Sequence, residues 1–175
     1  MKKRRKSRKK NKFRLIKWFL SIIWTLFISF ILLYNPLTAM FLTVVVAKEN
    51  NIDTQMFYRL IATESSFFTF AYSKQKAIGL GQVQKNTALY MFPESSTIML
   101  WFPPSNLQIS ATYLNYLLDK YQGNKSLALA AYNWGETNVD KKLNELRIEI
   151  NSNENYRILF RNIPETYHFI GKILR

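Results

Sequence analysis

The chain lacks cysteine altogether, and it has one histidine, five glycines and five prolines among its 175 residues. Without cysteine it holds no disulfide, no thiolate nucleophile, no Cys-ligated metal and no lipid anchor on an N-terminal cysteine. A single histidine, His168, offers no ligand cluster for a metal, and we interpret it as structural. We therefore expect an activity that needs neither a metal nor another cofactor.

Acidic residues are also scarce, with 11 Asp and Glu against 25 Lys and Arg, and the excess of positive charge is gathered at one end. Residues 1–17 contain no acid, and the rest of the chain is close to neutral. An apolar fraction of 48% with 15% aromatic residues predicts a packed core beyond this segment. The basic side chains are Lys2, Lys3, Arg4, Arg5, Lys6, Arg8, Lys9, Lys10, Lys12, Arg14 and Lys17.

An uncharged apolar run follows the basic segment, from Trp18 to Tyr34. Roughly 20 apolar residues in a helix cross a bilayer core of about 30 Å, and this run reaches that length if it begins at Leu15. Proline lacks an amide donor, so Asn35-Pro36 should end the helix. The sequence therefore predicts three parts: a basic cytoplasmic segment at 1–17, a transmembrane signal-anchor at 18–36 and a folded domain at 37–175.

The basic cluster predicts the orientation of this segment, because Lys and Arg are retained on the cytoplasmic side. We expect residues 18–34 to lie in the cytoplasmic membrane and the domain after them to be periplasmic or otherwise extracytoplasmic. A nucleic-acid-binding arm is disfavoured, because the cluster abuts an apolar span. A cleaved signal peptide is the closer alternative, with a weak cleavage motif at 37–39, Leu-Thr-Ala.

Helical spacing of apolar residues dominates residues 37–175, so we predict an all-α domain with long loops around a cleft. Residues 37–47 are too short to span a membrane and should form its first helix. Asp53 should cap a helix whose apolar positions continue to Phe68, and Ser105 should cap another that ends near Gly123. Shorter helices are predicted at 126–132 and 165–174.

Glu64 is anomalous in the first of these helices, because it lies on the apolar face. It follows Leu60 and Ile61 by one turn and precedes Phe67 and Phe68 by one turn. Burial disfavours the charged form of a carboxyl, so such a residue can hold a proton near neutral pH and act as a general acid. The alternative is that Glu64 ends the helix and turns its carboxyl to solvent.

Four short motifs in this domain resemble, in order and spacing, those of the soluble lytic transglycosylase family. The resemblance covers roughly residues 41–175 and implies a lysozyme-like α-helical fold, related to that of goose-type lysozyme, and cleavage of peptidoglycan glycan strands. The motifs are ATESSF at 62–67, GLGQV at 79–83, AAYNWG at 130–135 and IPET at 163–166.

The resemblance also implies roles for single residues. Glu64 matches the catalytic acid/base. Gln82 matches a cleft amide that binds sugar, and Tyr132 and Asn133 match a pair that orients the glutamate and contacts the saccharide. The implied substrate-binding residues are Ser73, Gly79, Gly81, Gln82, Tyr132, Asn133 and Glu165.

The sequence departs from the family pattern at several positions near these motifs. Lys76 stands where the family usually has a glycine, and Gly81 replaces a more frequent methionine. None of the departures touches Glu64, so they concern the shape of the cleft rather than the class of reaction. The remaining ones are Gln84, Lys85, Trp134 and Phe169.

The family reaction needs one carboxyl, whereas an ordinary glycosidase uses two. The resemblance implies cleavage of the bond between N-acetylmuramic acid and N-acetylglucosamine, with a 1,6-anhydromuramoyl end as product. One alternative is hydrolysis by the same fold, with Glu165 or another acid positioning water. The other is non-catalytic glycan binding. Expected partners are glycan strands, the membrane and cell-wall or envelope machinery; no nucleic acid is expected.

Overall fold

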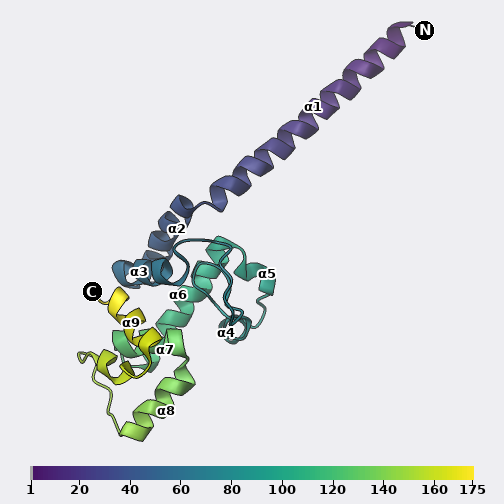
Figure 1. Ribbon diagram of the computed structural model, residues 1–175. Helices are drawn as coiled ribbons and strands as arrows, with labels where there is room; N and C mark the ends of the chain where they lie inside the picture. The colour runs from purple at the N-terminus through teal and green to yellow at the C-terminus, as the bar shows by residue number, and fades with distance from the viewer. Residues whose placement is uncertain (1) are drawn as a thin grey trace.

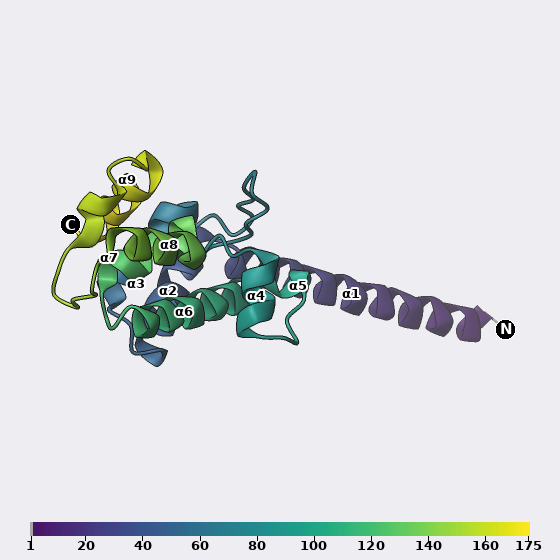
Figure 2. The ribbon, with the colours of Figure 1, turned by 90° about the horizontal axis from the view of Figure 1, so that it is seen from below.

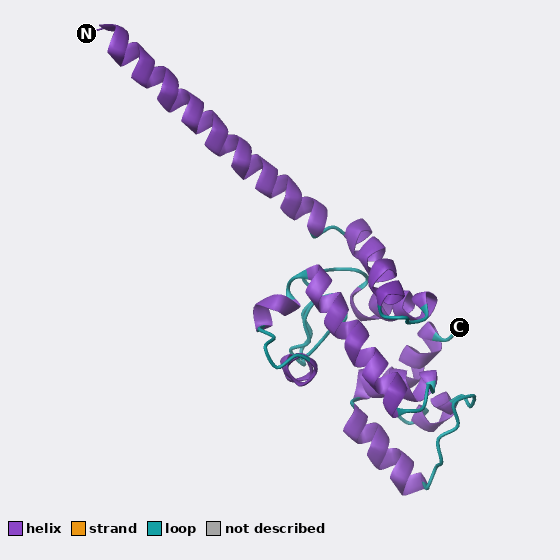
Figure 3. Cartoon of the chain, turned by 180° about the vertical axis from the view of Figure 1, so that it is seen from behind, coloured by secondary structure: helices purple, strands orange, loops and turns teal. Residues whose placement is uncertain are grey.

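The computed structural model describes the backbone of residues 2–175 and the side chains of residues 13–175, so the basic side chains at positions 2–12 lie outside the described residues. Within residues 2–175 the regular structure is helical, and Figure 3 shows helices joined by loops. Two isolated bridges, Tyr72 with Ile78 and Ile78 with Val83, are the β-type pairings of this part of the chain. The predicted all-α class is confirmed.

The N-terminal helix, α1 (Lys2–Leu33), extends away from the domain as a rod (Figures 1 and 2). Its stretch Phe13–Leu33 has 21 residues, is apolar enough to cross a membrane, and has no buried residue. The chain then turns at Asn35, whose side chain accepts a hydrogen bond from the amide of Thr38 and caps α2 (Pro36–Glu49). The break at Asn35-Pro36 and the helix after it agree with the sequence prediction.

The helix that carries Glu64 is α3 (Thr54–Ser65). Asp53 caps it as expected, with its carboxylate accepting hydrogen bonds from the amides of Gln55 and Met56. The expected continuation to Phe68 is wrong, because Ser66 and Phe67 both adopt left-handed backbone angles, with φ of 53° and 61°. Glu64 consequently sits in the last turn of the helix, at the point where the chain leaves it.

The central helix, α6 (Pro103–Lys120), begins two residues before the Ser105 that we expected to cap it. Proline fits the first helical position because its missing amide proton has no partner there, so the Pro103-Pro104 pair starts the helix from Phe102. A helix of this length provides one long apolar face. Its fully buried positions include Leu107, Ala111, Leu114 and Leu117.

Helices α2, α4 (Lys85–Met91), α5 (Thr97–Leu100) and α7 (Lys125–Trp134) pack directly on α6, and the others pack on these. The helix α7 is buried along most of its length and lies between α6 and α9 (Pro164–Ile173). Lys120 of α6 bonds Glu136 and Asp140 at 2.6 and 2.7 Å and ties α8 (Glu136–Leu146) to the core. The sequence analysis did not anticipate α8, nor the short elements α4, α5 and the 3₁₀ helix η1 (Tyr156–Phe160).

Candidate active site

A polar cleft of about 540 Å³ opens between the end of α3, the loop that follows it, and helices α6, α7 and α9. Six of the eight predicted site residues line this cleft, although they come from positions up to a hundred residues apart in the chain. They are Glu64, Ser73, Gln82, Tyr132, Asn133 and Glu165.

Glu64 is the residue whose ionisation the site alters most. Its carboxyl is half-buried, and this burial raises its pKa to about 8. The negative charge of Glu165, which lines the same cleft, raises the pKa of Glu64 further. A carboxyl in this condition keeps its proton at neutral pH and can give it to a substrate oxygen.

Glu165, in contrast to Glu64, is exposed to water. It lies in the first turn of α9, after Pro164. The N-terminus of a helix favours negative charge, because its backbone amides point outward without partners. The cleft therefore contains one carboxyl that holds a proton and a second that remains in contact with water.

Tyr132 lies near Glu64 on α7. Its hydroxyl donates a 2.8 Å hydrogen bond to the carbonyl oxygen of Gly81. Removal from water raises the pKa of Tyr132 well above its ordinary value, and the charge of Glu64 raises it further. The phenol thus stays protonated beside the carboxyl, and it links α7 to the loop before α4.

Asn133, the next residue, is held from the other side of the cleft. The buried hydroxyl of Thr166 on α9 donates a 2.8 Å hydrogen bond to its Oδ1 atom. This contact orients the amide, and its nitrogen is left available as a donor. Thr166 lies in the last of the four motifs, but the sequence analysis assigned it no role.

Gly79 and Gly81 do not line the cleft. A Cβ at Gly79 would collide with the side chain of Asn106, and one at Gly81 would collide with Ser110. The two glycines allow the loop to approach α6, so their missing Cβ atoms serve packing inside the protein.

Asn106 is a further site residue that the sequence analysis missed. Its buried side chain accepts a 2.8 Å hydrogen bond from the amide of Gly81 and donates to the carbonyl oxygens of Ile78 and Leu100, at 2.8 and 2.9 Å. Both side-chain protons and the oxygen of this amide are thereby bonded to backbone groups of the loop and of α5. The available signal was an asparagine on the apolar face of α6, one turn before Ser110.

Ser73 and Gln82 stand at the two ends of a strained loop. The hydroxyl oxygen of Ser73 accepts a 3.1 Å hydrogen bond from the amide of Ala77 and closes a turn. Within this turn Lys76 has a left-handed φ of 63°. Gln82 has a φ of 48°, and its side-chain nitrogen donates to the carbonyl oxygen of Gly79 at 2.9 Å. Lys76 stands where the resembling family has glycine, and its backbone keeps the conformation that glycine adopts easily.

Tyr113 of α6 also lines the cleft and was not anticipated. Its ring lies 5.4 Å from that of Tyr132 and 6.2 Å from that of Tyr116. Burial raises the pKa of Tyr113 to about 12, so this wall is aromatic and uncharged at neutral pH. Such a wall can pack against the apolar face of a sugar ring.

Residues 42–155 match the family model described as the transglycosylase SLT domain. The match covers more than half of the chain, and its ends enclose Glu64, Gln82 and Asn133. The chain belongs to this family. The resemblance to this family is thereby confirmed; the match includes the first three motifs and ends before the fourth, at 163–166.

Three relatives show how far the similarity extends. A membrane-bound lytic murein transglycosylase E of Buchnera aphidicola is 28% identical, and the match covers 59% of this chain and 60% of that protein. The lytic transglycosylase Slt of Pseudomonas aeruginosa, solved as an inactive mutant with glutamine in place of a glutamate, is 27% identical with a TM-score of 0.63. The 70-kDa soluble lytic transglycosylase of Escherichia coli is 25% identical, also with a TM-score of 0.63.

These matches differ in extent. The two solved structures align with 75% and 76% of this SLT-family chain, but with only 22% of their own chains. The chain spans about 60% of the length of the Buchnera protein. The fold and the family are therefore shared over one domain, while the activity is a proposal for this chain.

Proposed function

We propose that the protein is a peptidoglycan lytic transglycosylase that uses Glu64 as its single acid and base. The observation that carries this proposal is one half-buried, protonated carboxyl at the cleft, with a pKa of about 8, among the neutral donors Gln82, Tyr132 and Asn133. Membership of the SLT family supports it. The inactive Pseudomonas relative, with its glutamate changed to glutamine, supports it as well.

In the proposed reaction, neutral Glu64 gives its proton to the oxygen that links N-acetylmuramic acid to N-acetylglucosamine. The substrate's own N-acetyl group stabilises the positive charge that develops at the anomeric carbon. Glu64, now a carboxylate, accepts the proton of the muramoyl 6-hydroxyl, and that oxygen bonds to the anomeric carbon. The product is a 1,6-anhydromuramoyl end, and no water is consumed.

The neighbouring residues prepare the carboxyl and hold the sugar. Tyr132 presents a protonated phenol to the side of Glu64 and is fixed by Gly81. The amide nitrogen of Asn133, oriented by Thr166, is suited to a carbonyl acceptor such as an N-acetyl group. Gln82, held by Gly79, offers a second amide on the same face.

A lysozyme-like hydrolysis is the second candidate, and the position of Glu165 favours it. Glu165 lines the same cleft and its charge acts on Glu64, so it could activate a water molecule for attack. The same cleft would then release reducing muramic ends instead of anhydro ends. The products therefore distinguish the two reactions.

We also propose that α1 is an uncleaved anchor and that the domain lies on the extracytoplasmic side. The basic residues before Trp18 indicate this orientation. The candidate cleavage motif lies within α2, and its last residue, Ala39, is fully buried. Cutting there would remove the first turn of a helix that packs against α3 and α6.

The function is tested by mass spectrometry of the fragments that the full-length protein releases from purified peptidoglycan. Fragments lighter by one water than hydrolysis products are expected, and Glu64→Gln should release none. Glu94→Gln, which changes an exposed carboxyl outside the cleft, is the matched control and should behave as the unchanged protein. Reducing ends would establish hydrolysis, and an active Glu64→Gln protein would exclude Glu64 as the acid.

A further inference from the structure

The segment that follows α3 exposes aromatic rings on one side. The exposed fractions of Phe68, Phe70 and Tyr72 are 57%, 42% and 59%. Phe67, which precedes them, and Thr69, which lies between the first two, are buried. The segment consists of tight turns, in which the amide of Ala71 donates a hydrogen bond to the carbonyl oxygen of Phe68, and these turns direct the three rings outward. The outward face carries three aromatic rings and no charge.

A second segment, around α5, exposes apolar side chains in the same way. Ile98 is 80% exposed and Phe102 is 41% exposed, while Leu100 between them is buried. The whole stretch from Ser95 to Leu118 contains no charged residue. Most of this stretch is the core helix α6, so the exposed uncharged part is limited to residues 95–102 around α5.

The two segments form one surface. The ring of Tyr72 stacks on that of Trp101, with centroids 6.1 Å apart and planes 26° from parallel. Behind them, Asn106 bonds the carbonyl oxygens of both Ile78 and Leu100. We call this surface the apolar rim and define it as Phe68, Phe70, Tyr72, Ile98 and Phe102.

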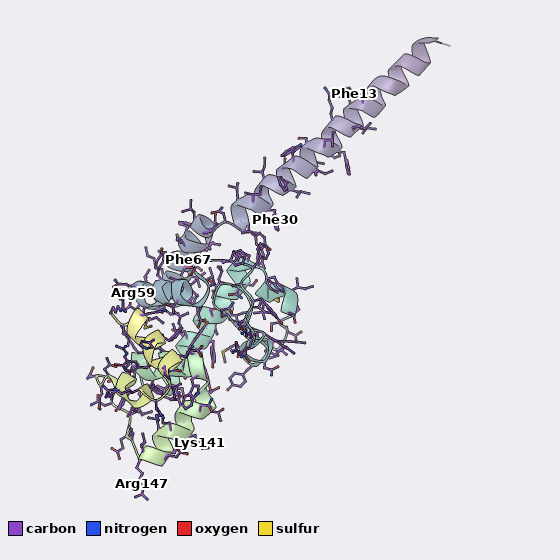
Figure 4. The ribbon with its side chains drawn as sticks, viewed as in Figure 1. Phe13, Phe30, Arg59, Phe67, Lys141 and Arg147 are labelled. Carbon is purple, nitrogen blue, oxygen red and sulfur yellow. The ribbon has the colours of Figure 1, made fainter. Side chains whose placement is uncertain are left out.

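The apolar rim lies beside the end of α1. The ring of Phe70 stacks on that of Tyr34 at 5.1 Å, with planes only 3° from parallel, and it lies 6.4 Å from the ring of Phe30. Figure 4 shows Phe30 at the domain end of α1 and Phe67 just below it, with Lys141 and Arg147 at the far end of the domain. The rim is therefore continuous with the apolar helix that can span a membrane.

We propose that the apolar rim docks on the lipid surface from which α1 emerges, so that the domain lies against the outer leaflet in one orientation. This proposal rests on the proposed anchoring of α1. Aromatic rings favour the headgroup region of a bilayer, and binding strength grows with the apolar area that enters it. A membrane is the occupant favoured here because the rim adjoins the end of the span.

Docking would also set the position of the cleft. Ser73, which lines the cleft, directly follows Tyr72 of the rim. The strained turn from Ser73 to Ala77 joins the two, so the height of the cleft above the lipid is determined by a few residues. The enzyme would then cut glycan that lies close to the membrane rather than glycan farther out in the wall.

The absence of cysteine allows a direct test in the full-length chain. Single cysteines replace Phe68 or Ile98 in the rim, Leu146 on α8, or Phe27 in α1, and each carries a fluorophore. All four native side chains are exposed, and Leu146, at 52%, is the matched apolar control far from α1. The labelled proteins are reconstituted in vesicles of phosphatidylethanolamine and phosphatidylglycerol that contain lipid spin-labelled near the headgroup or deep in the acyl chain.

Headgroup-level spin labels should quench the fluorophores at positions 68 and 98 at least about twofold more than the one at 146. Quenching at 68 and 98 equal to that at 146 would overturn the docking. The label at 27 separates the two proposals: strong quenching there by deep spin labels shows that α1 spans the bilayer, whatever the rim does. If position 27 is not quenched, the anchoring itself fails.

A second variant distinguishes a rim that contacts the lipid from one that is only near it. Phe68→Gln combined with Ile98→Gln should reduce headgroup quenching of a fluorophore at position 102 about twofold, because apolar contact with the lipid is lost. Leu146→Gln should leave it unchanged. Unchanged quenching in the double variant would overturn lipid docking. Energy transfer between rim fluorophores on two copies of the chain would also overturn it, in favour of a protein interface.

Discussion

Two walls of the same cleft each carry a glutamate, and the two side chains differ in burial. Glu64 is in the last turn of α3, half-buried, with a pKa of about 8. Glu165 is in the first turn of α9 and exposed. A carboxyl at the end of a helix faces unpaired carbonyl oxygens, whereas one at the start faces unpaired amides. The comparison shows that burial, not residue type, distinguishes the two carboxyls.

The largest expected effect is on catalysis at the Glu64 wall. Glu64→Gln should lower the rate of glycan cleavage by roughly 10²–10⁴-fold, because a general acid of the right pKa contributes about that much. Glu165→Gln should lose far less under the proposed lyase reaction. Rates of muropeptide release measure both, and an equal loss in the two variants would turn the assignment towards a two-carboxyl hydrolase.

The second effect is on the pH dependence of the free energy of unfolding. The pKa of Glu64 is raised from its ordinary value of 4.5 to about 8 in the folded protein. The folded state thus holds a proton that the unfolded state has lost, so stability falls as the pH rises from about 4.5 to about 8. Glu64→Gln removes this loss, which is on the order of a few kcal/mol.

Thermal unfolding at several pH values tests this sign. The melting temperature of Glu64→Gln should exceed that of the unchanged protein by more at pH near 8 than at pH near 5. Glu165→Gln, measured alongside, should show a smaller dependence because its side chain is exposed. A constant difference across this range would mean that the folded state does not hold the proton on Glu64.

The third effect compares the residues that support each wall. Tyr132→Phe removes the hydroxyl beside Glu64 and its hydrogen bond to Gly81, and we expect about a fivefold loss of rate for about 1 kcal/mol of interaction. Thr166→Val removes the hydroxyl that orients Asn133 and should act mainly on substrate binding. Steady-state kinetics with a soluble glycan separate kcat from KM. A change confined to KM in Tyr132→Phe would remove Tyr132 from the catalytic group.

The smallest effect links the two walls directly. The charge of Glu165 raises the pKa of Glu64, so Glu165→Gln should lower it and move the alkaline limb of the pH–rate profile to lower pH. The expected displacement is below about one pH unit, because Glu165 is exposed and its charge is screened by water. Glu94→Gln, which changes an exposed carboxyl outside the cleft, is the control. An unmoved limb in Glu165→Gln would show that the two carboxyls are not coupled.

Much of the fold could be predicted from local pattern. Asp53 as a cap, the break at Asn35-Pro36 and the apolar spacing around Glu64 depend on neighbours within one or two turns. The errors were also local. Pro103 starts α6 before Ser105, and left-handed angles at Ser66 end α3 early. Each error concerned a helix end, where two signals compete within a few residues.

Local patterns could not predict the contacts that hold the site residues in place. Asn106 bonds Gly81, 25 positions away, and Thr166 bonds Asn133, 33 positions away. Their roles require these distant residues to be brought together. Gly79 and Gly81 show the same limit, because their use in packing against α6 depends on Asn106 and Ser110. The motifs marked which residues gather at the cleft, but they did not show how each is held.

The sequence by itself determined the charge-free span, its basic flank, the helical class and the family to which the domain belongs. These properties follow from composition and from spacing along the chain. Only the tertiary structure decided the raised pKa of Glu64, the effect of the Glu165 charge on it and the contact of Phe70 with the end of α1. Burial and charge act through space, so they depend on which distant segments meet when the chain folds.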